Sequence, residues 1–350
     1  MVRIGIIGTG GMANAHAATF NAMKGVKLVA CCDVVAERAQ AFAEKHGIAK
    51  VYTDYREMLG KEKLHGVSNV TPDAMHAEIS LAVIEHGLAI FCEKPLATSL
   101  ADAKKMRDAA LRAGVVNMVN FSYRNSCGLQ KAAEVVRKGA LGRIIHVEAS
   151  YLQSWLANVS WGNWQTNPGL AWRLSTKHGS AGDMGDLGCH IYDMTTLLCG
   201  DIAEINCQLR TFDKGIPGNQ LGEYVLDAND SFISIVSFAN GGLGTIHSSR
   251  WATGQANSLR VRVYGDKGAI EVDLDRAYDD YRICQGKDAL TFTWKTVKCK
   301  PTPSNYQRFI RAIKTGVNDV NDFVNGAKIQ AYLESSFTSD RQHGPVAVEF

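Results

Sequence analysis

The sequence has 350 residues, of which 46% are hydrophobic and 21% are charged, and its formal net charge is +3. These values are typical of an ordinary soluble globular protein with about two domains. The lack of a Lys/Arg cluster argues against a nucleic-acid interface, and no apolar run approaches the roughly 20 residues that a membrane helix needs.

The N-terminus and the cysteines indicate a cytoplasmic protein. Residues 1–8 enter a strand directly, without the apolar region and cleavage site of a secretion signal. The nine cysteines are odd in number and form no C-x-x-C pair, which favours a reducing compartment over a disulfide framework. The ten histidines show no ligand spacing with the cysteines, so we expect no metal site.

The first motif of the chain is a glycine-rich turn between a strand and a helix. The apolar strand 3–7 meets Gly8-Thr9-Gly10-Gly11-Met12-Ala13, a G-x-G-x-x-A pattern. A helical run to Met23 follows, and then a second apolar strand, 26–32, which ends in Asp33. Because strand, turn, helix, second strand and terminal acid occur in order, the motif predicts a dinucleotide-binding site.

Residues of this motif have separate physical roles in binding a dinucleotide. Gly8 permits the tight turn, Gly10 allows the backbone to approach the pyrophosphate, and Ala13 lets the helix pack closely on the strand, so that helix amides face the phosphates. Asp33 would accept hydrogen bonds from the adenosine ribose and repel a 2′-phosphate, which favours NAD over NADP. Arg38 leaves NADP open, because a nearby arginine could accommodate that phosphate.

Strands and helices continue to alternate up to about residue 121, which is typical of a parallel, doubly wound sheet. One strand, 88–92, is apolar throughout and runs into Glu93-Lys94-Pro95. Open α/β sheets bind ligands at the carboxyl ends of their strands. Lys94 is therefore a candidate for chemistry, and a solvated lysine at a strand end is the alternative.

The apolar residues of the second half change to a period of two. Several strand candidates occur between residues 205 and 298, with a hairpin signal at Asn240-Gly241, so we expect a mostly antiparallel sheet. No low-complexity linker separates the halves. The fold class expected is α/β, with a dinucleotide-binding Rossmann domain over 1–122 and a second α/β domain over 123–350.

Asp186 and His190 form a second candidate group with Lys94. They are four residues apart, so they share one face if a helix begins here. His190 can take a proton from a substrate hydroxyl, Lys94 can stabilise the developing alkoxide, and Asp186 can orient the imidazole or the substrate. Taken alone, a capping aspartate and a buried structural histidine explain the same pattern.

Taken together, the motifs resemble the Gfo/Idh/MocA family, the relatives of glucose–fructose oxidoreductase and inositol dehydrogenase. The matches keep the family's order and span nearly the whole chain: Gly8–Ala13, Thr71-Pro72 with His76, Glu93-Lys94-Pro95, Tyr123-Arg124, Trp172-Arg173, Asp186–His190 with Asp193, and Tyr264–Gly268.

The resemblance implies a Rossmann domain, a C-terminal domain with a large open sheet, and a dimer or tetramer formed through that sheet. It implies Lys94, Asp186 and His190 as the catalytic residues. The residues that it implies along the cofactor, besides the glycine motif and Lys94, are Thr71, His76 and Glu93. It implies that Arg173 lies near the junction of cofactor and substrate, and Arg124 of the matching Tyr123-Arg124 motif is a further candidate substrate residue.

Four of the six tryptophans lie within residues 155–172, with Asn and Gln side chains between them. Aromatic faces stack on the C–H face of a sugar ring while amides bind its hydroxyls, so Trp164 and Trp172 are candidate substrate contacts. The alternative is that these tryptophans pack a domain junction or a subunit interface.

The leading hypothesis is an NAD-dependent dehydrogenase that oxidises a secondary hydroxyl of a sugar or cyclic polyol. Some family relatives retain NAD and cleave glycosidic bonds through transient oxidation, which gives a second hypothesis. A sugar-sensing protein without catalysis is the third, and the presence of Lys94, Asp186 and His190 argues against it.

Overall fold

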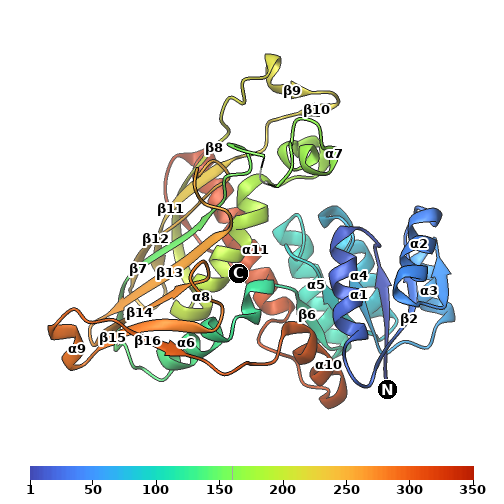
Figure 1. Ribbon diagram of the computed structural model, residues 1–350, viewed down its shortest axis with the longest axis horizontal. Helices are drawn as coiled ribbons and strands as arrows, with labels where there is room; N and C mark the ends of the chain where they lie inside the picture. The colour runs from blue at the N-terminus through green and yellow to red at the C-terminus, as the bar shows by residue number, and fades with distance from the viewer. Residues whose placement is uncertain (160) are drawn as a thin grey trace. The chain divides into compact units, whose positions relative to one another are not determined.

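The structure is a computed structural model that describes residues 1–159 and 161–350. The chain forms two compact units (Figure 1). We call Met1–Ser122 with Pro303–Gln330 the Rossmann unit, and Tyr123–Thr302 with Ala331–Phe350 the sheet unit. No helix in these described ranges has the length and apolar character needed to cross a membrane.

Six parallel strands form the sheet of the Rossmann unit, in the order β3-β2-β1-β4-β5-β6. The order reverses between β1 and β4, so the predicted doubly wound sheet is confirmed. The strands are β1 (Val2–Ile7), β2 (Val26–Cys32), β3 (Lys50–Tyr52), β4 (Gly66–Asn69), β5 (Ala89–Cys92) and β6 (Asn117–Val119). The helices that connect them are α1 (Gly11–Asn21), α2 (Ala36–His46), α3 (Tyr55–Lys61), α4 (His76–Glu85) and α5 (Leu100–Ala113).

Local sequence signals fix several of these helix ends. Asp54 accepts a hydrogen bond from Arg56 N at the start of α3, and Ser99 accepts one from Asp102 N at the start of α5. These caps satisfy amides that have no partner within the helix. Gly47 and Gly114 end α2 and α5 in the left-handed conformation that glycine adopts without strain.

Helix α10 (Asn305–Thr315) returns to the Rossmann unit from the far end of the sequence. Its apolar residues Tyr306, Phe309 and Ile310 share one buried core with Phe20 of α1 and Phe91 of β5. Each such buried side chain contributes about 1.5–3 kcal/mol. The domain boundaries expected from the sequence assign all of 123–350 to the second domain, and so they do not place α10 in the Rossmann unit. The period of an amphipathic helix shows that one face is buried, but it does not indicate against which sheet.

Nine strands form the sheet of the second unit, in the order β16-β15-β14-β13-β7-β12-β11-β8-β17. Only β7 and β12 pair in parallel in the described sheet, so the expected mostly antiparallel sheet is confirmed. The strands are β7 (Ile144–Leu152), β8 (Ile202–Arg210), β11 (Ser231–Phe238), β12 (Leu243–Ser249), β13 (Ser258–Gly265), β14 (Gly268–Asp273), β15 (Asp280–Gln285), β16 (Lys295–Lys298) and β17 (Val346–Ala347).

Helices pack against one face of this sheet. Helix α6 (Cys127–Arg137) contacts β14 and β15, and α8 (Cys189–Cys199) contacts β7, β12 and β13. Helix α11 (Phe323–Gln342) bonds to β8, since Ser339 and Asp340 accept from the amides of Cys207 and Leu209. Smaller elements of this unit include α7 (Pro168–Ala171), α9 (Lys287–Leu290) and the hairpin of β9 (Gln220–Leu221) and β10 (Tyr224–Val225).

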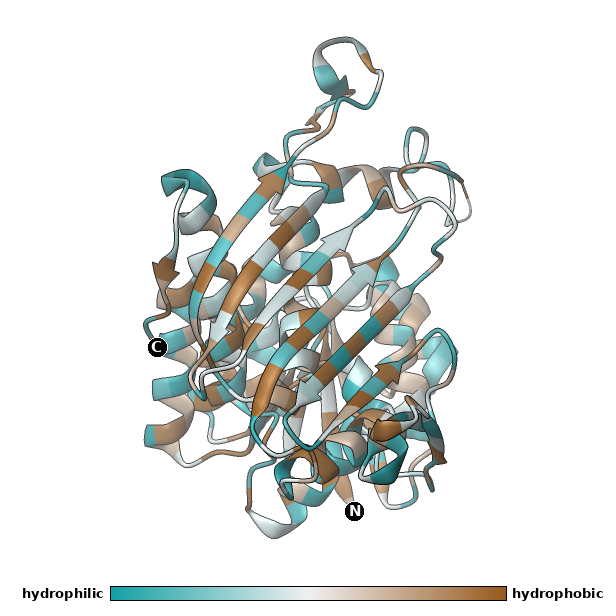
Figure 2. Cartoon of the chain, turned by 90° about the vertical axis from the view of Figure 1, so that its left-hand side faces the viewer, coloured by the Kyte–Doolittle hydropathy of each residue, from teal (hydrophilic) through white to brown (hydrophobic). Residues whose placement is uncertain are grey.

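The opposite face of the nine-stranded sheet is turned toward the viewer in Figure 2, where apolar and polar residues alternate along the strands. Ile233 and Ile235 of β11 are 63% and 51% exposed, and Leu243 of β12 is 51% exposed. Their strand neighbours Phe232 and Val236 point to the helix-covered face and are buried. Because side chains alternate between the faces of a strand, these exposed residues form an apolar row, the open-face row, on the solvent side.

Candidate active site

The glycine turn of the Rossmann unit leaves room for a bound group. Gly8 has a φ of +85°, and a Cβ there would lie 2.6 Å from the Val70 carbonyl oxygen. A Cβ on Gly10 or Gly11 would meet no described atom within 4 Å. Helix α1 begins here without a side-chain cap and without an acidic residue in its first turn. Its first amides therefore suit the pyrophosphate of a dinucleotide.

Asp33 lies at the end of β2 and is 7% exposed. Its carboxylate accepts hydrogen bonds from Thr9 N and Thr9 Oγ1 at 2.8 and 2.9 Å, from Val35 N, and from the half-exposed Arg38 guanidinium at 2.6 and 3.0 Å. Burial alone would raise the pKa of Asp33, but these hydrogen bonds lower it below its ordinary value. The acid expected at the ribose is thus ionised and tied to the glycine turn.

Glu93 follows β5 and is held by protein groups. Its Oε1 lies 2.8 Å from His16 Nε2 and accepts from Asn120 Nδ2 at 2.6 Å, while Oε2 accepts from Lys94 N at 3.2 Å. Burial alone would raise the pKa of Glu93, but the bonds from His16 and Asn120 lower it to about 2. His16 lies on α1, so this buried pair joins the glycine-turn helix to the segment that carries the half-buried Lys94.

His76 is fully buried at the start of α4. Its Nδ1 lies 2.7 Å from the Pro95 carbonyl oxygen, and its Nε2 lies 3.0 Å from the Thr71 carbonyl oxygen. A carbonyl oxygen can only accept, so both ring nitrogens donate and the ring is an imidazolium. Burial opposes this charge, but Cys92, Asp73 and the Pro95 carbonyl raise the pKa of His76 to about 10. The ring thereby ties the Thr71 loop to the loop that follows Lys94.

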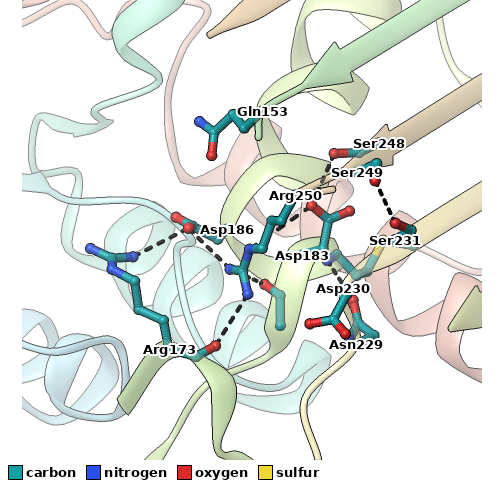
Figure 3. Close-up of polar contacts among 12 residues, drawn as sticks. Gln153, Arg173, Asp183, Asp186, Asn229, Asp230, Ser231, Ser248, Ser249 and Arg250 are labelled. Atoms are coloured by element: carbon teal, nitrogen blue, oxygen red, sulfur yellow. Dashed lines mark hydrogen bonds and ion pairs between the residues drawn. The ribbon is translucent and has the colours of Figure 1, made fainter. Parts of the chain in front are cut away.

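Asp186 of the sheet unit is held by two arginines (Figure 3). Its Oδ2 accepts from Arg173 NH1 at 3.2 Å and from Arg250 NH2 at 3.1 Å. Asp186 lies in a π-helical turn, Met184–Gly188, that leads directly into α8. π-Turns within helices are frequent at functional sites. The expected helix is therefore present, and it begins one short turn before Asp186.

His190 lies on α8 and is 6% exposed. Its ring packs edge-on against Tyr123, with centroids 4.8 Å apart, and lies near Tyr151. The two tyrosine hydroxyls are 2.6 Å apart, and Asn257 bonds to both. The imidazole thus borders a buried polar network that a substrate hydroxyl could join.

The predicted substrate contacts fall into two groups. Arg124 is 3% exposed and forms a two-pronged ion pair with Asp193 at 2.7 and 2.8 Å. Trp164 is 5% exposed in an apolar cluster with Trp155 and Leu174. Both side chains are therefore buried and held by protein groups, and their substrate role stays a prediction. Trp172 and Arg173 are partly exposed, and the Arg173 guanidinium lies 4.9 Å from the Trp172 ring centroid.

The residues at these sites that were not predicted from the sequence include His16, Asp183 and Arg250. Arg250 directly follows strand β12 and is 0% exposed. Its one visible signal is a charged residue placed directly after a strand, and many surface residues share that signal. His16 and Asp183 stand in helical segments and carry no motif of their own.

Comparison with known families and proteins identifies the chain. Residues 2–121 match the model of the oxidoreductase family with an NAD-binding Rossmann fold, and residues 129–271 match the GFO/IDH/MocA C-terminal domain. D-glucoside 3-dehydrogenase of Escherichia coli (strain K12) is 31% identical, over 80% of this chain and 79% of that protein. This chain belongs to the Gfo/Idh/MocA family.

Other similar proteins agree with this assignment. Levoglucosan dehydrogenase of Pseudarthrobacter phenanthrenivorans is 29% identical, over 82% of this chain and 77% of that protein. A solved structure of levoglucosan dehydrogenase, in complex with NADH and levoglucosan, aligns over 100% of both chains with a TM-score of 0.89 and 26% identity. The predicted α/β fold is thus the fold of the family.

The Gfo/Idh/MocA assignment also establishes the cofactor. The matched N-terminal domain is an NAD-binding Rossmann fold, and similar structures are NADH complexes. The residues present fit that group, because Gly10 and Gly11 leave open space in front of uncapped helix amides. The protein is an NAD-binding oxidoreductase, and the predicted enzyme class and cofactor are confirmed.

Proposed function

We propose that this Gfo/Idh/MocA protein is an NAD-dependent dehydrogenase that oxidises a secondary hydroxyl of a sugar or cyclic polyol. The observation that carries the proposal is the full-length likeness to levoglucosan dehydrogenase in complex with NADH and levoglucosan. D-glucoside 3-dehydrogenase and the myo-inositol 2-dehydrogenase of Thermotoga maritima also match most of the chain. The substrates in these names share a ring that carries several hydroxyl groups.

The proposal assigns one role to each catalytic residue. His190 accepts the hydroxyl proton as general base, Lys94 stabilises the negative charge that develops on that oxygen, and Asp186 supports the charged imidazole. Bound NAD supplies the hydride acceptor. The support for Asp186 is its position, since two guanidinium groups hold it and it precedes His190 by four residues in one helical segment.

The experiment is NADH formation with a panel of levoglucosan, methyl glucosides, myo-inositol, glucose and glucose 6-phosphate. We expect NADH with at least one ring polyol, and a loss of roughly 10²–10⁴-fold in kcat for Lys94→Met and His190→Asn. Lys105→Met, an exposed lysine in α5 of the same unit, is the matched control and should keep full activity. A protein that binds NAD but forms no NADH, and instead cleaves a glycoside, would be assigned to the hydrolase branch of the family.

We also propose that two or more copies associate through the open-face row. The support is the exposure of Ile233, Ile235 and Leu243 on a sheet face that no described element of the chain covers. Contiguous exposed apolar residues mark interaction sites on soluble proteins. A second copy brings the same row, so the contact would be self-complementary.

The proposed compartment is the cytoplasm. Its support is that all nine cysteines are free and eight of them are buried, which is the usage expected in a reducing environment.

A further inference from the structure

Arg250 is the largest fully buried side chain in the described part of the chain. Its NH2 group donates to the Gly182 carbonyl at 3.0 Å and to Asp186 Oδ2 at 3.1 Å, and its NH1 group donates to the Arg173 carbonyl at 3.2 Å. The guanidinium carbon lies 5.2 Å from the Trp155 ring centroid. One planar group therefore fixes three points of the segment that leads to His190 (Figure 3).

The backbone that carries Arg250 is itself fixed. Arg250 follows β12, a strand paired on both sides by β7 and β11. Its amide donates to the Asp230 carbonyl at 3.0 Å, and its carbonyl accepts from Leu156 N at 3.2 Å. A residue on such an element can hold a catalytic carboxylate in one place.

A second acid, Asp183, also lies beside Arg250, and it is 0% exposed. Its Oδ1 is 4.0 Å from Arg250 Nε, which is too far for a hydrogen bond. Its Oδ2 has no hydrogen-bond partner among the described residues. A buried carboxylate without such partners costs several kcal/mol, so this environment suits a neutral acid.

Ser248 gives Asp183 only a shared hydrogen bond. The single hydroxyl proton of Ser248 has two acceptors, the Tyr151 carbonyl oxygen at 2.7 Å and Asp183 Oδ1 at 3.1 Å, and the shorter contact is the one to the carbonyl. Burial raises the pKa of Asp183 well above its ordinary value. The positive charge of Arg250 and the bond from Ser248 lower this pKa, and the negative charges of Asp186 and Asp230 raise it further.

We propose that Arg250 is a positioning residue for the dehydrogenase reaction: it orients and charge-balances Asp186, while Asp183 stays a neutral carboxylic acid. The inference rests on the proposed function and adds one positioning residue, Arg250, to it. Because Asp183 carries no charge, Asp186 is the carboxylate that the positive charge of Arg250 stabilises. Lysine cannot replace Arg250, since one ammonium group cannot reach three separate acceptors from one plane.

A double-mutant cycle tests the positioning role. We expect Arg250→Lys to lower kcat/KM by about ten- to hundredfold, since small displacements of a catalytic group have effects of that size. In an Asp186→Asn background, Arg250→Lys should lower kcat/KM by less than about threefold, because the carboxylate that Arg250 positions is already absent. If the Arg250→Lys variant does not fold, Arg250→Gln, which keeps two hydrogen-bond donors, replaces it in the cycle. Losses that multiply across the cycle overturn the positioning role.

Asp183→Asn is the matched control, since an amide has nearly the shape of a carboxylic acid and, like the neutral acid, carries no charge. We expect its kcat/KM to stay within about threefold of wild type. A buried acid with a raised pKa makes the wild type lose stability as pH rises above about 4, and the amide does not titrate. The Tm of Asp183→Asn should therefore rise relative to wild type between pH 5 and 8.

The two readouts separate the two proposals. A constant or falling Tm difference overturns the neutral state of Asp183, whether or not the enzyme is active. Wild-type protein that oxidises no polyol overturns the proposed function, and with it the positioning role, while the Tm series still decides the charge of Asp183.

Discussion

Replacing Glu93 by Gln breaks the buried pair at the end of β5. Glu93 is 8% exposed, His16 is 0% exposed, and the contact between them is 2.8 Å. The pKa of Glu93 falls from 4.5 to about 2, which at about 1.4 kcal/mol per pH unit corresponds to roughly 3 kcal/mol of stability at pH 7. Removing a buried charged acceptor, which leaves its hydrogen-bond donors unmatched, costs about 1–3 kcal/mol or more. We therefore expect Glu93→Gln to lower the free energy of unfolding by about 3 kcal/mol.

The pH dependence of this loss has a definite sign. A carboxylate with a lowered folded pKa stabilises the protein above about pH 4.5 and loses that contribution as the pH falls toward 2. The difference between wild type and Glu93→Gln should therefore narrow below pH 4.5. Urea unfolding followed by far-UV circular dichroism measures it. Tryptophan fluorescence reports the sheet unit separately, because all six tryptophans lie between residues 155 and 294.

The matched control is Glu78→Gln, which removes the same charge from the same unit. Glu78 contacts Arg56 at 2.8 Å, but the two side chains are 51% and 61% exposed. Exposed pairs contribute at most about 1 kcal/mol. The buried-pair reasoning is refuted if Glu93→Gln costs no more than Glu78→Gln at pH 7.

Three further predictions concern the cofactor, the imidazolium and the open-face row. Asp33→Asn should weaken NAD binding about tenfold and improve NADP relative to NAD, as measured by NADH and NADPH fluorescence titrations. His76→Gln should lower the Tm at pH 7, and the difference should close toward pH 10. A histidine whose pKa is raised on folding stabilises the folded protein fully below its ordinary pKa of 6.5. This contribution is lost as the pH passes the folded-state pKa of about 10. If the proposed association through the open-face row is correct, Ile233→Arg should give a monomer in light scattering where the wild type gives an oligomer.

Each of these predictions has an outcome that contradicts it. Equal NAD affinity in Asp33→Asn would mean that Arg38 and Thr9 already satisfy the carboxylate in the bound state. A Tm difference for His76→Gln that is constant from pH 7 to 10 would mean that the ring is neutral. A wild type that is already monomeric, or an Ile233→Arg variant with unchanged mass, would exclude the open-face row as the interface.

Residues that act through their neighbours along the chain could be predicted from the sequence. The Gly8 turn, the acid at Asp33 and the caps at Asp54 and Ser99 depend on spacings of a few residues, so the pattern contains them. The parallel, doubly wound Rossmann sheet follows from the alternation of strands and helices.

Residues that act across the fold could not be predicted. Arg250 meets Asp186 over a separation of 64 residues, and His16 meets Glu93 over 77. No period or spacing encodes such a pairing, because it depends on which strands become neighbours. The role of Trp164 could not be predicted for a different reason. A tryptophan suits both a sugar-binding face and a packed core, and its burial (5% exposed) depends on the tertiary fold.

The return of α10 to the Rossmann unit has a consequence for synthesis on the ribosome. Strands β1 to β6 are complete by residue 119, but Tyr306, Phe309 and Ile310 of their core emerge only after the whole of 123–302 has been translated. During that interval Phe20 and Phe91 lack a cover that the finished protein has. Chaperone binding to the nascent chain should therefore peak before residue 305 leaves the exit tunnel, and a fragment that ends at residue 122 should aggregate unless α10 is fused to it.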